Sequence, residues 1–339
     1  MASEAPPFWW APPDWRARAL RPVSALYGLI AGQRMRRARR ERIAAPVLCV
    51  GNLTVGGTGK TPLAIAMAQA AAGKGLKPGF LSRGYGGSIS APHLVDPDHD
   101  SARVVGDEPI LLAAHAPVAV TPNRAAGARL LIEKGCNFLI MDDGFQSARI
   151  HMDHALLVID ARYGLGNGHV IPGGPVRAPL VEQLRHASSL VKMGEGKAAD
   201  QVVRLAARAG RPVYEALLRP RPGQHLAGRR FLAFAGIGHP EKFYASVAAA
   251  GGEVAATRSF PDHHAFTEEE LQELSTAAGL DGLELITTAK DAARLRGGSS
   301  AARAFLESVR ILHVEAFFDL ANAPARIIAE TLEAYRRRR

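Results

Sequence analysis

Cysteine and long apolar runs are both scarce in this chain. Only Cys49 and Cys136 occur among 339 residues, which excludes a disulfide framework or a thiolate zinc cluster and favours a reducing compartment. No apolar run approaches the roughly 20 residues that a helix needs to cross a bilayer. The N-terminus also lacks a charged segment followed by an apolar one, so we expect neither a membrane span nor a cleaved signal peptide.

Basic residues exceed acidic ones, but the excess lies at the two ends of the chain. The formal net charge is +10. Residues 1–45 contain nine arginines and three acidic residues, and residues 336–339 are four arginines. The rest of the chain carries equal numbers of basic and acidic side chains. A folded surface that binds nucleic acid carries the basic excess itself, so we expect no nucleic-acid partner.

Residues 8–42 form a distinct N-terminal unit. All three tryptophans lie here, at positions 9, 10 and 15, and an arginine-rich stretch follows apolar residues at nearly helical spacing. Asp14 is placed to cap a helix. This composition is typical of an amphipathic helix at an anionic membrane surface. A terminal helix docked on its own domain has the same composition, so the residues alone leave both interpretations open.

Strands and helices alternate from residue 46 onward. Short apolar segments indicate buried strands at 47–50, 79–82, 118–120, 138–141 and 156–159, with helices at 63–72 and 124–134. This alternation predicts an α/β fold in which a P-loop NTPase-like parallel sheet is flanked by helices. Further strands at 231–235, 253–256, 285–288 and 311–314 predict a second, smaller α/β domain.

A stretch rich in proline and arginine near residue 220 predicts a linker between these two domains. The expected units are an N-terminal amphipathic segment at 1–45, a P-loop core at 46–210, a linker at 211–225, and the smaller domain with its basic tail at 226–339.

The strongest motif is a glycine-rich turn between an apolar strand and a helix. Residues 51–61 (GNLTVGGTGKT) have the spacing of a P-loop, except that Thr54 stands where the usual pattern has glycine. Backbone N–H groups of such a turn surround phosphate oxygens at a helix N-terminus. The lysine reaches the β- and γ-phosphates and the final threonine ligates Mg²⁺. The predicted nucleotide-binding residues are Thr54, Val55, Gly56, Gly57, Thr58, Gly59, Lys60 and Thr61.

Two carboxylates, Asp142 and Asp143, end the apolar strand that begins near residue 138. Such a pair also occurs in turns, but P-loop enzymes hold Mg²⁺ or its water with an acid at a neighbouring strand end. Both are therefore predicted metal ligands together with Thr61. The guanine-specific Asn-Lys-x-Asp motif is absent, and Val55 stands where one class of dimerising ATPases has lysine, so ATP is the expected nucleotide.

Two further segments have both a structural and a catalytic interpretation. Asp107, in Gly-Asp-Glu-Pro, is placed to cap a helix or to take the proton from a hydroxyl acceptor. His263, in Pro-Asp-His-His, belongs to a polar loop or reaches across an interdomain cleft to that base, and His264 is equally placed. The polar segment at 151–154 lacks the spacing of a zinc site, so we expect surface residues there.

Taken together, these motifs resemble the tetraacyldisaccharide 4′-kinases, the lipid A 4′-kinase family of Gram-negative bacteria. The matching segments are 51–62 (GNLTVGGTGKTP), 82–87 (SRGYGG), 106–109 (GDEP), 142–146 (DDGFQ), 166–168 (GNG), 235–240 (AGIGHP), 262–263 (DH) and 290–292 (KDA). They follow the order of the family, in which Thr54 is a regular feature. Ala289 replaces the glutamate usual in a late Thr-Glu-Lys-Asp motif, so no catalytic role is expected for that segment.

The resemblance implies a reaction and assigns residues to it. It implies ATP- and Mg²⁺-dependent phosphorylation of the 4′-hydroxyl of a tetraacylated glucosamine disaccharide 1-phosphate, giving lipid IV-A in lipid A biosynthesis. It further implies that Asp107 is the general base, that His263 assists it, and that the strand-end aspartates serve Mg²⁺. Arg83 and Arg124 are candidates for binding the phosphate of the substrate, because a guanidinium matches phosphate geometry.

The substrate implied by the resemblance is a membrane lipid, which favours the interfacial interpretation of the N-terminal unit. We expect a peripheral enzyme at the cytoplasmic face of the bacterial inner membrane, with the lipid disaccharide and an anionic membrane surface as partners and no protein partner. The alternatives are a soluble P-loop kinase of a small metabolite and a nucleotide-switched assembly ATPase.

Overall fold

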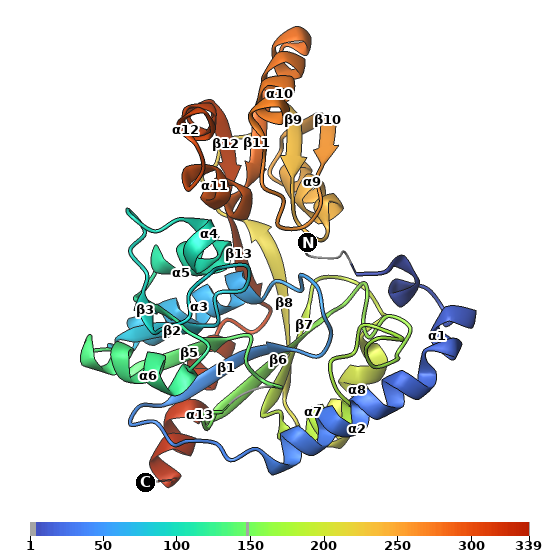
Figure 1. Cartoon of the computed structure of the whole chain (residues 1–339), viewed down its shortest axis with the longest axis vertical. Coiled ribbons are helices and arrows are strands. Elements are labelled where there is room, and N and C mark those ends of the chain that lie inside the picture. Colours follow the sequence, from blue (N-terminus) through green and yellow to red (C-terminus); the bar gives the residue numbers. More distant parts are fainter. Residues whose placement is uncertain (1–4, 147–148, 339) are drawn as a thin grey trace.

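The structure, a computed structural model, describes residues 5–146 and 149–338. Two sheets organise this part of the chain, the larger below and the smaller above in Figure 1. The larger sheet has nine strands in the order β13 (Val314–Phe318), β8 (Val213–Pro220), β7 (Ser189–Met193), β6 (His154–Asp160), β1 (Val47–Asn52), β5 (Phe138–Asp142), β2 (Pro78–Ser82), β4 (Val118–Val120) and β3 (His93–Leu94). The predicted parallel α/β sheet is thereby confirmed.

The strands of the larger sheet are parallel except at its two edges, where β13 and β3 run antiparallel to their neighbours. Every residue of β1, β5 and β6 is buried, which is why these segments are continuous apolar runs and not alternating ones. In the register of the central strands, Val50 of β1 pairs with Asp142 of β5. The segments that follow these two strands therefore leave the same edge of the sheet side by side.

Helices cover both faces of the larger sheet. On one face lie α3 (Lys60–Gly73), α5 (Asp107–Ala113) and α13 (Ala323–Arg337), and on the other α6 (Arg124–Glu133), α7 (Leu180–His186) and α8 (Asp200–Arg208). The short α4 (Ala102–Val105) precedes α5. Each face has its own apolar core, so the sheet is the middle layer between two layers of helices.

The smaller sheet is all parallel. Its order is β10 (Glu253–Ser259), β9 (Arg230–Ala235), β11 (Glu284–Thr288) and β12 (Val309–Leu312). One face packs on α9 (Pro240–Ala249), and the other on α10 (Glu268–Asp281), α11 (Ala289–Arg296) and α12 (Ser300–Glu307). Helix α11 also contacts α4 and α5, so it joins the smaller unit to the larger one.

The predicted linker at 211–225 is wrong. Residues Val213–Pro220 form β8, which pairs with β7 on one side and β13 on the other. The predicted single strand at 311–314 is also two strands in different sheets, because β12 ends at Leu312 and β13 begins at Val314. After β12 the chain returns to the larger unit as β13 and α13, so the smaller domain does not extend to residue 339 as predicted. Proline and arginine near residue 220 suggested a linker because pairing with a strand about a hundred residues away leaves no local pattern.

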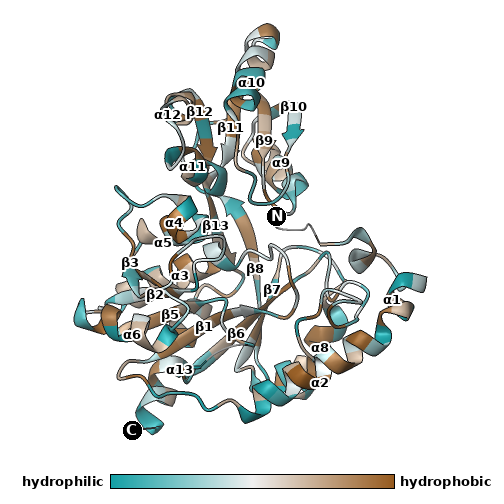
Figure 2. Ribbon diagram, in the orientation of Figure 1, coloured by the Kyte–Doolittle hydropathy of each residue, from teal (hydrophilic) through white to brown (hydrophobic). Residues whose placement is uncertain are grey.

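The N-terminal unit contains η1 (Pro7–Trp10), α1 (Trp15–Ala19) and α2 (Arg21–Arg37). Asp14 caps α1 as predicted, accepting hydrogen bonds from the N–H groups of Arg16 and Ala17. Helix α2 lies on α7, and its small residues face the protein: Gly28 lies against Pro179 and Gly32 against Glu182. Its large apolar side chains point outward, and brown covers the middle of α2 in Figure 2.

Arg338, in the arginine-rich C-terminal segment, is part of the fold. Arg338 donates through Nε and Nη2 to Asp153, and Nη2 also lies 3.0 Å from the carbonyl of Ile43. Asp153 accepts the N–H of Val47 at 2.8 Å, so the same carboxylate holds the start of β1. Asp153 and His154 are both buried, and the predicted surface location of this segment is wrong for them. A buried carboxylate requires a partner, and here the C-terminal helix supplies it.

We expect Arg338→Gln to lower the free energy of unfolding by about 2–4 kcal/mol, because the fully buried Asp153 side chain loses its cation. Arg337→Gln is the matched control. Its ion pair with Glu333 is exposed, so its loss changes the free energy of unfolding by less than about 0.5 kcal/mol. Urea unfolding of the two variants provides the measurement, and equal losses would contradict the anchoring role of Arg338.

Candidate active site

The glycine-rich turn lies between β1 and α3, as predicted for a P-loop. Gly56 and Gly59 adopt φ angles of 104° and 85°, which residues with side chains rarely reach. Asn52 braces the turn from inside: its Oδ1 accepts the Thr58 hydroxyl at 2.5 Å and its Nδ2 donates to the Gly56 carbonyl at 3.2 Å. The turn is therefore shaped by buried hydrogen bonds within its own sequence.

The first residues of the motif are hydrogen-bonded to another segment of the chain, whereas the last ones begin α3. The N–H of Val55 donates to the Pro175 carbonyl at 2.9 Å, and the Thr54 carbonyl accepts from Arg177 Nε at 3.1 Å. The first two predicted nucleotide-binding residues are thus held by the segment at 175–177. The later residues of the motif, from Gly57 to Thr61, lie at the tip of the turn and the start of α3, where backbone N–H groups bind phosphate.

The two strand-end aspartates differ in their surroundings. Asp143, with φ of 49°, receives both Nη atoms of Arg177 at 2.5 and 2.9 Å and lies 3.4 Å from the Lys60 ammonium. These cations hold the pKa of Asp143 below its usual range despite its burial. Asp142 is 2% exposed, and its Oδ1 has no hydrogen-bond partner among the described residues. Burial, with Glu108 as the next cause, raises the pKa of Asp142 to about 7.

The residues present fit a magnesium ion. The Oδ1 of Asp142 is a buried acceptor without a donor, and Mg²⁺ in such sites takes one or two carboxylates and the phosphates of the substrate. The Thr61 hydroxyl, at the start of α3, donates to Glu108 Oε1 at 3.5 Å, so it lies among the acids. The described residues form no group of three acidic, histidine or cysteine side chains that could hold a metal ion.

Asp107 lies at the first position of α5, after Gly106, and is 4% exposed. His263 Nδ1 lies 3.2 Å from Asp107 Oδ2, so the smaller unit brings the predicted histidine to the predicted base. Arg294 of α11 also contacts Asp107 Oδ2, through Nε at 3.0 Å and Nη2 at 2.5 Å. These neighbours hold the pKa of Asp107 below its usual range despite its burial, and the bond to Asp107 raises the pKa of His263.

The adjacent histidine has a different environment. His264 Nε2 lies 2.8 Å from Glu270 Oε2, and its ring stacks on Phe260 with centroids 4.9 Å apart. Between the two histidines that the sequence left open, it is His263 that contacts Asp107.

Three cationic residues that contact the acids of the site, Arg177, Lys290 and Arg294, were not predicted from the sequence. Lys290 Nζ lies 2.5 Å from Glu108 Oε1, and Arg294 contacts Asp107, although this segment was expected to have no catalytic role. Their spacing of four residues on a helix was the available signal. Arg177 belongs to the irregular, glycine- and proline-rich segment at 167–179, and irregular segments of this length often carry functional residues.

The two predicted substrate arginines are placed differently. Arg83 is exposed beyond the end of β2. Arg124, at the start of α6, is 6% exposed and donates from Nη2 to the backbone carbonyl of Asp143 at 2.7 Å. That bond supports the left-handed turn at Asp143. Phosphate binding by either arginine stays a prediction.

Comparison with known proteins gives this arrangement a family. A sequence model of the family described as tetraacyldisaccharide-1-P 4′-kinase matches residues 16–333. The chain belongs to this family. The tetraacyldisaccharide 4′-kinase of Mesorhizobium japonicum is 66% identical over 340 residues, which cover 100% of this chain and 99% of that protein. That of Chelativorans sp. is 60% identical, over 99% of this chain and 98% of the relative.

A solved structure agrees with the family assignment. The LpxK protein of Aquifex aeolicus, whose crystal structure is described as a complex with ATP, superposes with a TM-score of 0.71 and 26% sequence identity. The match covers 93% of this chain and 99% of that one. The family is one of kinases, which sets aside the alternative of a nucleotide-switched assembly ATPase.

Because burial raises the pKa of Asp142, we expect this residue to make the thermal stability of the protein depend on pH. Its folded pKa of about 7 lies above the unfolded value of about 3.9, so the stabilisation from its proton is present at low pH and is lost as the pH rises through the folded pKa. Asp142→Asn avoids this loss. We expect the thermal midpoint of the nucleotide-free variant, measured by calorimetry, to rise relative to wild type between about pH 5 and about pH 8.

Asp143→Asn is the control for this measurement. Arg177 and Lys60 lower the folded pKa of Asp143, so its stabilisation is present above the unfolded pKa and is lost only in acid. This variant should be less stable than wild type at about pH 8. A parallel response of the two variants would contradict the different roles of the two aspartates.

Proposed function

We propose that this protein transfers the γ-phosphoryl group of ATP to the 4′-hydroxyl of a tetraacylated disaccharide 1-phosphate, with Asp107 as the general base. The contact between Asp107 and His263 is the observation that carries the proposal. It joins the two units of the chain at one carboxylate. The next residue, Glu108, reaches the Thr61 hydroxyl at the start of α3, so the base lies beside the P-loop.

The geometry suits a transfer that needs a weak base. Phosphoryl transfer passes through a loose transition state in which the acceptor proton leaves late. Asp107, kept ionised by its neighbours, accepts a hydrogen bond from the acceptor hydroxyl and orients it toward the phosphate. His263 contacts Oδ2 of that carboxylate and keeps it oriented while the proton of the hydroxyl moves to Asp107. Bound Mg²⁺ would neutralise charge on the transferred group, with Thr61 and Asp142 as the residues that would hold it. Asp143 stays a predicted ligand, although its oxygens are here paired with Arg177 and Lys60.

Lys60 must change partners when nucleotide binds. Its ammonium lies 3.4 Å from Asp143, and the β- and γ-phosphates compete for it. Arg177 remains on Asp143 with two hydrogen bonds, so the aspartate keeps a cation when the lysine leaves. The loop N–H groups from Gly57 onward complete the phosphate site.

Asp107→Asn should lower kcat by at least about 10²-fold and leave ATP affinity within about twofold of wild type, because it removes the proton acceptor and not the P-loop. Labelled ATP with the disaccharide lipid measures turnover, and titration calorimetry measures ATP binding. Full activity in Asp107→Asn would overturn the proposal.

The two histidines provide a matched pair for the same assay. His263→Gln should lower kcat by about tenfold or more, because it breaks the contact with Asp107. His264→Gln loses contacts with Glu270, Phe260 and Phe266 but none with Asp107, and should keep near wild-type turnover. Equal losses in both variants would point to damage of the loop and not of the site.

We also propose that α2 rests on an anionic membrane surface at the cytoplasmic face of the inner membrane. In the described residues no helix is long and apolar enough to cross a bilayer. Helix α2 nevertheless exposes large apolar side chains, with Leu26 60% and Leu29 61% exposed. A helix that only covered its own domain would bury these residues and expose its glycines. The exposed apolar side chains of this surface are Trp15, Val23, Leu26, Tyr27, Leu29 and Ile30.

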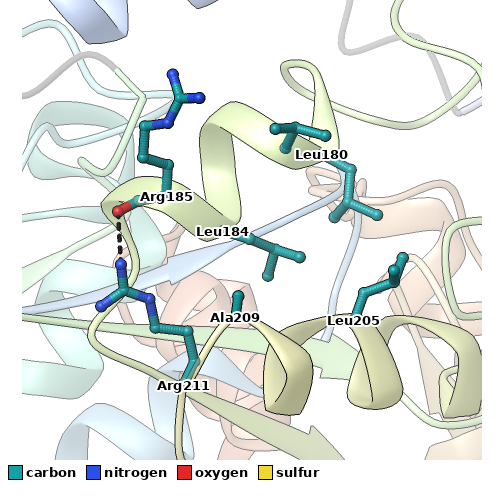
Figure 3. A pocket seen from close by; sticks show the side chains of 7 residues that line it. Leu180, Leu184, Arg185, Leu205, Ala209 and Arg211 are labelled. Carbon is teal, nitrogen blue, oxygen red and sulfur yellow. Dashed lines mark hydrogen bonds between the residues drawn. The ribbon is translucent and has the colours of Figure 1, made fainter.

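An apolar groove lies between α7, which packs on α2, and α8. Leu180, Leu184, Leu205 and Ala209 of α7, α8 and the following turn converge on it in Figure 3, and its volume is about 380 Å³. Arg185 and Arg211 lie at one end of the groove, where Arg211 donates to the Arg185 carbonyl. Helix α7 packs against α2, so apolar side chains with flanking arginines extend over both helices, a pattern suited to lipid headgroups.

Leu26→Glu with Leu29→Glu should abolish most binding to vesicles that contain anionic phospholipid, because carboxylates replace the apolar contact. Leu280→Glu is the control, since Leu280 is 82% exposed on α10 of the smaller unit. Vesicle sedimentation measures the bound fraction. Unchanged sedimentation of the double variant would contradict the membrane role of α2.

A further inference from the structure

Helix α11 presents two cations, one turn apart, to two adjacent acids of α5. Lys290 Nζ lies 2.5 Å from Glu108 Oε1, and Arg294 Nη2 lies 2.5 Å from Asp107 Oδ2. The acids belong to the larger unit and the cations to the smaller one. The contact between the units therefore consists, at this point, of ion pairs on the proposed base and on its neighbour.

Arg294 is itself held rigidly. Its side chain is 9% exposed, and its Nη1 donates at 2.6 Å both to the Gly236 carbonyl and to Asp291 Oδ1. Asp291, fully buried, accepts the Gly236 N–H and the Thr288 hydroxyl and so fixes the start of α11. With Nη1 occupied in this way, Nε and Nη2 are left to face Asp107.

We propose that Arg294 is a positioning residue for phosphoryl transfer, which holds the Asp107 carboxylate in the orientation that accepts the substrate proton. The inference rests on the proposed role of Asp107. Arg294 and His263 both bind Oδ2, and the Glu108 N–H donates to Oδ1 at 2.9 Å. These contacts fix the plane of the carboxylate, and the guanidinium supplies two of the donors.

Several charged groups surround Asp107. Arg294 and Lys290 approach from α11, His263 from the loop before α10, and Glu108 from α5, with Asp291 and Asp262 behind them. Removal of one cation from this set raises the pKa of Asp107. A residue that served only to dock the two units would leave the pH dependence of the reaction unchanged, so the pH profile separates the two roles.

The fold does not depend on Arg294 alone. Lys290 still pairs with Glu108 in its absence, and the neighbouring Ala293 and Leu295 are buried in apolar cores. Arg294→Gln therefore retains the packing of α11. Arg294→Lys keeps the charge without the planar fork, and Arg296→Gln changes an exposed arginine of the same helix as the control.

The experiment measures kcat and KM of the full chain with ATP and the disaccharide lipid over a range of pH. For Arg294→Gln we expect kcat to fall by about 10- to 100-fold, KM for ATP to stay within about twofold, and the acid limb of kcat to move to higher pH. Arg294→Lys should recover part of kcat and the wild-type acid limb, and Arg296→Gln should match wild type. Thermal unfolding confirms that each variant is folded.

The inference would be overturned if folded Arg294→Gln had the kcat of the wild type and its pH profile of kcat had the same acid limb. A proportional loss of kcat in Arg294→Gln and Arg294→Lys, with the wild-type pH profile in both, would assign Arg294 to docking alone and overturn it too. Asp107→Asn separates this failure from that of the proposed function. If Asp107→Asn is inactive while Arg294→Gln has normal activity, only the positioning role of Arg294 is wrong. If Asp107→Asn is active, the assignment of Asp107 as the base is wrong as well.

Discussion

Ion pairing among a crowded set of carboxylates and cations holds the site together. Acids close to one another raise each other's pKa and repel unless cations lie between them. Asp142 is the acid of the site with a buried oxygen that has no hydrogen-bond partner among the described residues, and burial raises its pKa. The acids are Asp107, Glu108, Asp142 and Asp143, and their cationic partners are Lys60, Arg177, His263, Lys290 and Arg294. In the proposed reaction, nucleotide and metal would replace some of these pairs, such as that between Lys60 and Asp143.

The residues of these ion pairs come from both units of the chain. The larger sheet places the P-loop and the strand-end aspartates side by side because β1 and β5 are parallel neighbours. The smaller sheet brings His263, Lys290 and Arg294 to the acids of α5 from segments that follow β10 and β11. Asp107, the proposed base, thus lies where the two units meet, held by side chains of the smaller one. The N-terminal helix carries an exposed apolar surface.

Local sequence predicted those features that one segment encodes by itself. The strands from 47 to 159 were found because burial on both faces makes them continuous apolar runs. The P-loop and Asp142–Asp143 followed from their positions after such strands. The errors concern distant pairing: β8 was taken for a linker, β12 and β13 were taken for one strand, and Asp153 was expected at the surface. Each is resolved by a partner far along the chain, β13 for β8 and Arg338 for Asp153.

The α/β class, the phosphate-binding turn and, through the family motifs, the pairing of Asp107 with His263 could all be predicted without a structure. The first two depend on short-range patterns, since glycine spacing and strand ends are set by the residues within them. The contacts of Arg294, Lys290 and Arg177 with the acids of the site became visible in the folded chain alone, as did the inward glycines and outward leucines of α2. The reason is physical: a cation pairs with whatever carboxylate the fold brings within reach, and no local pattern records that distance.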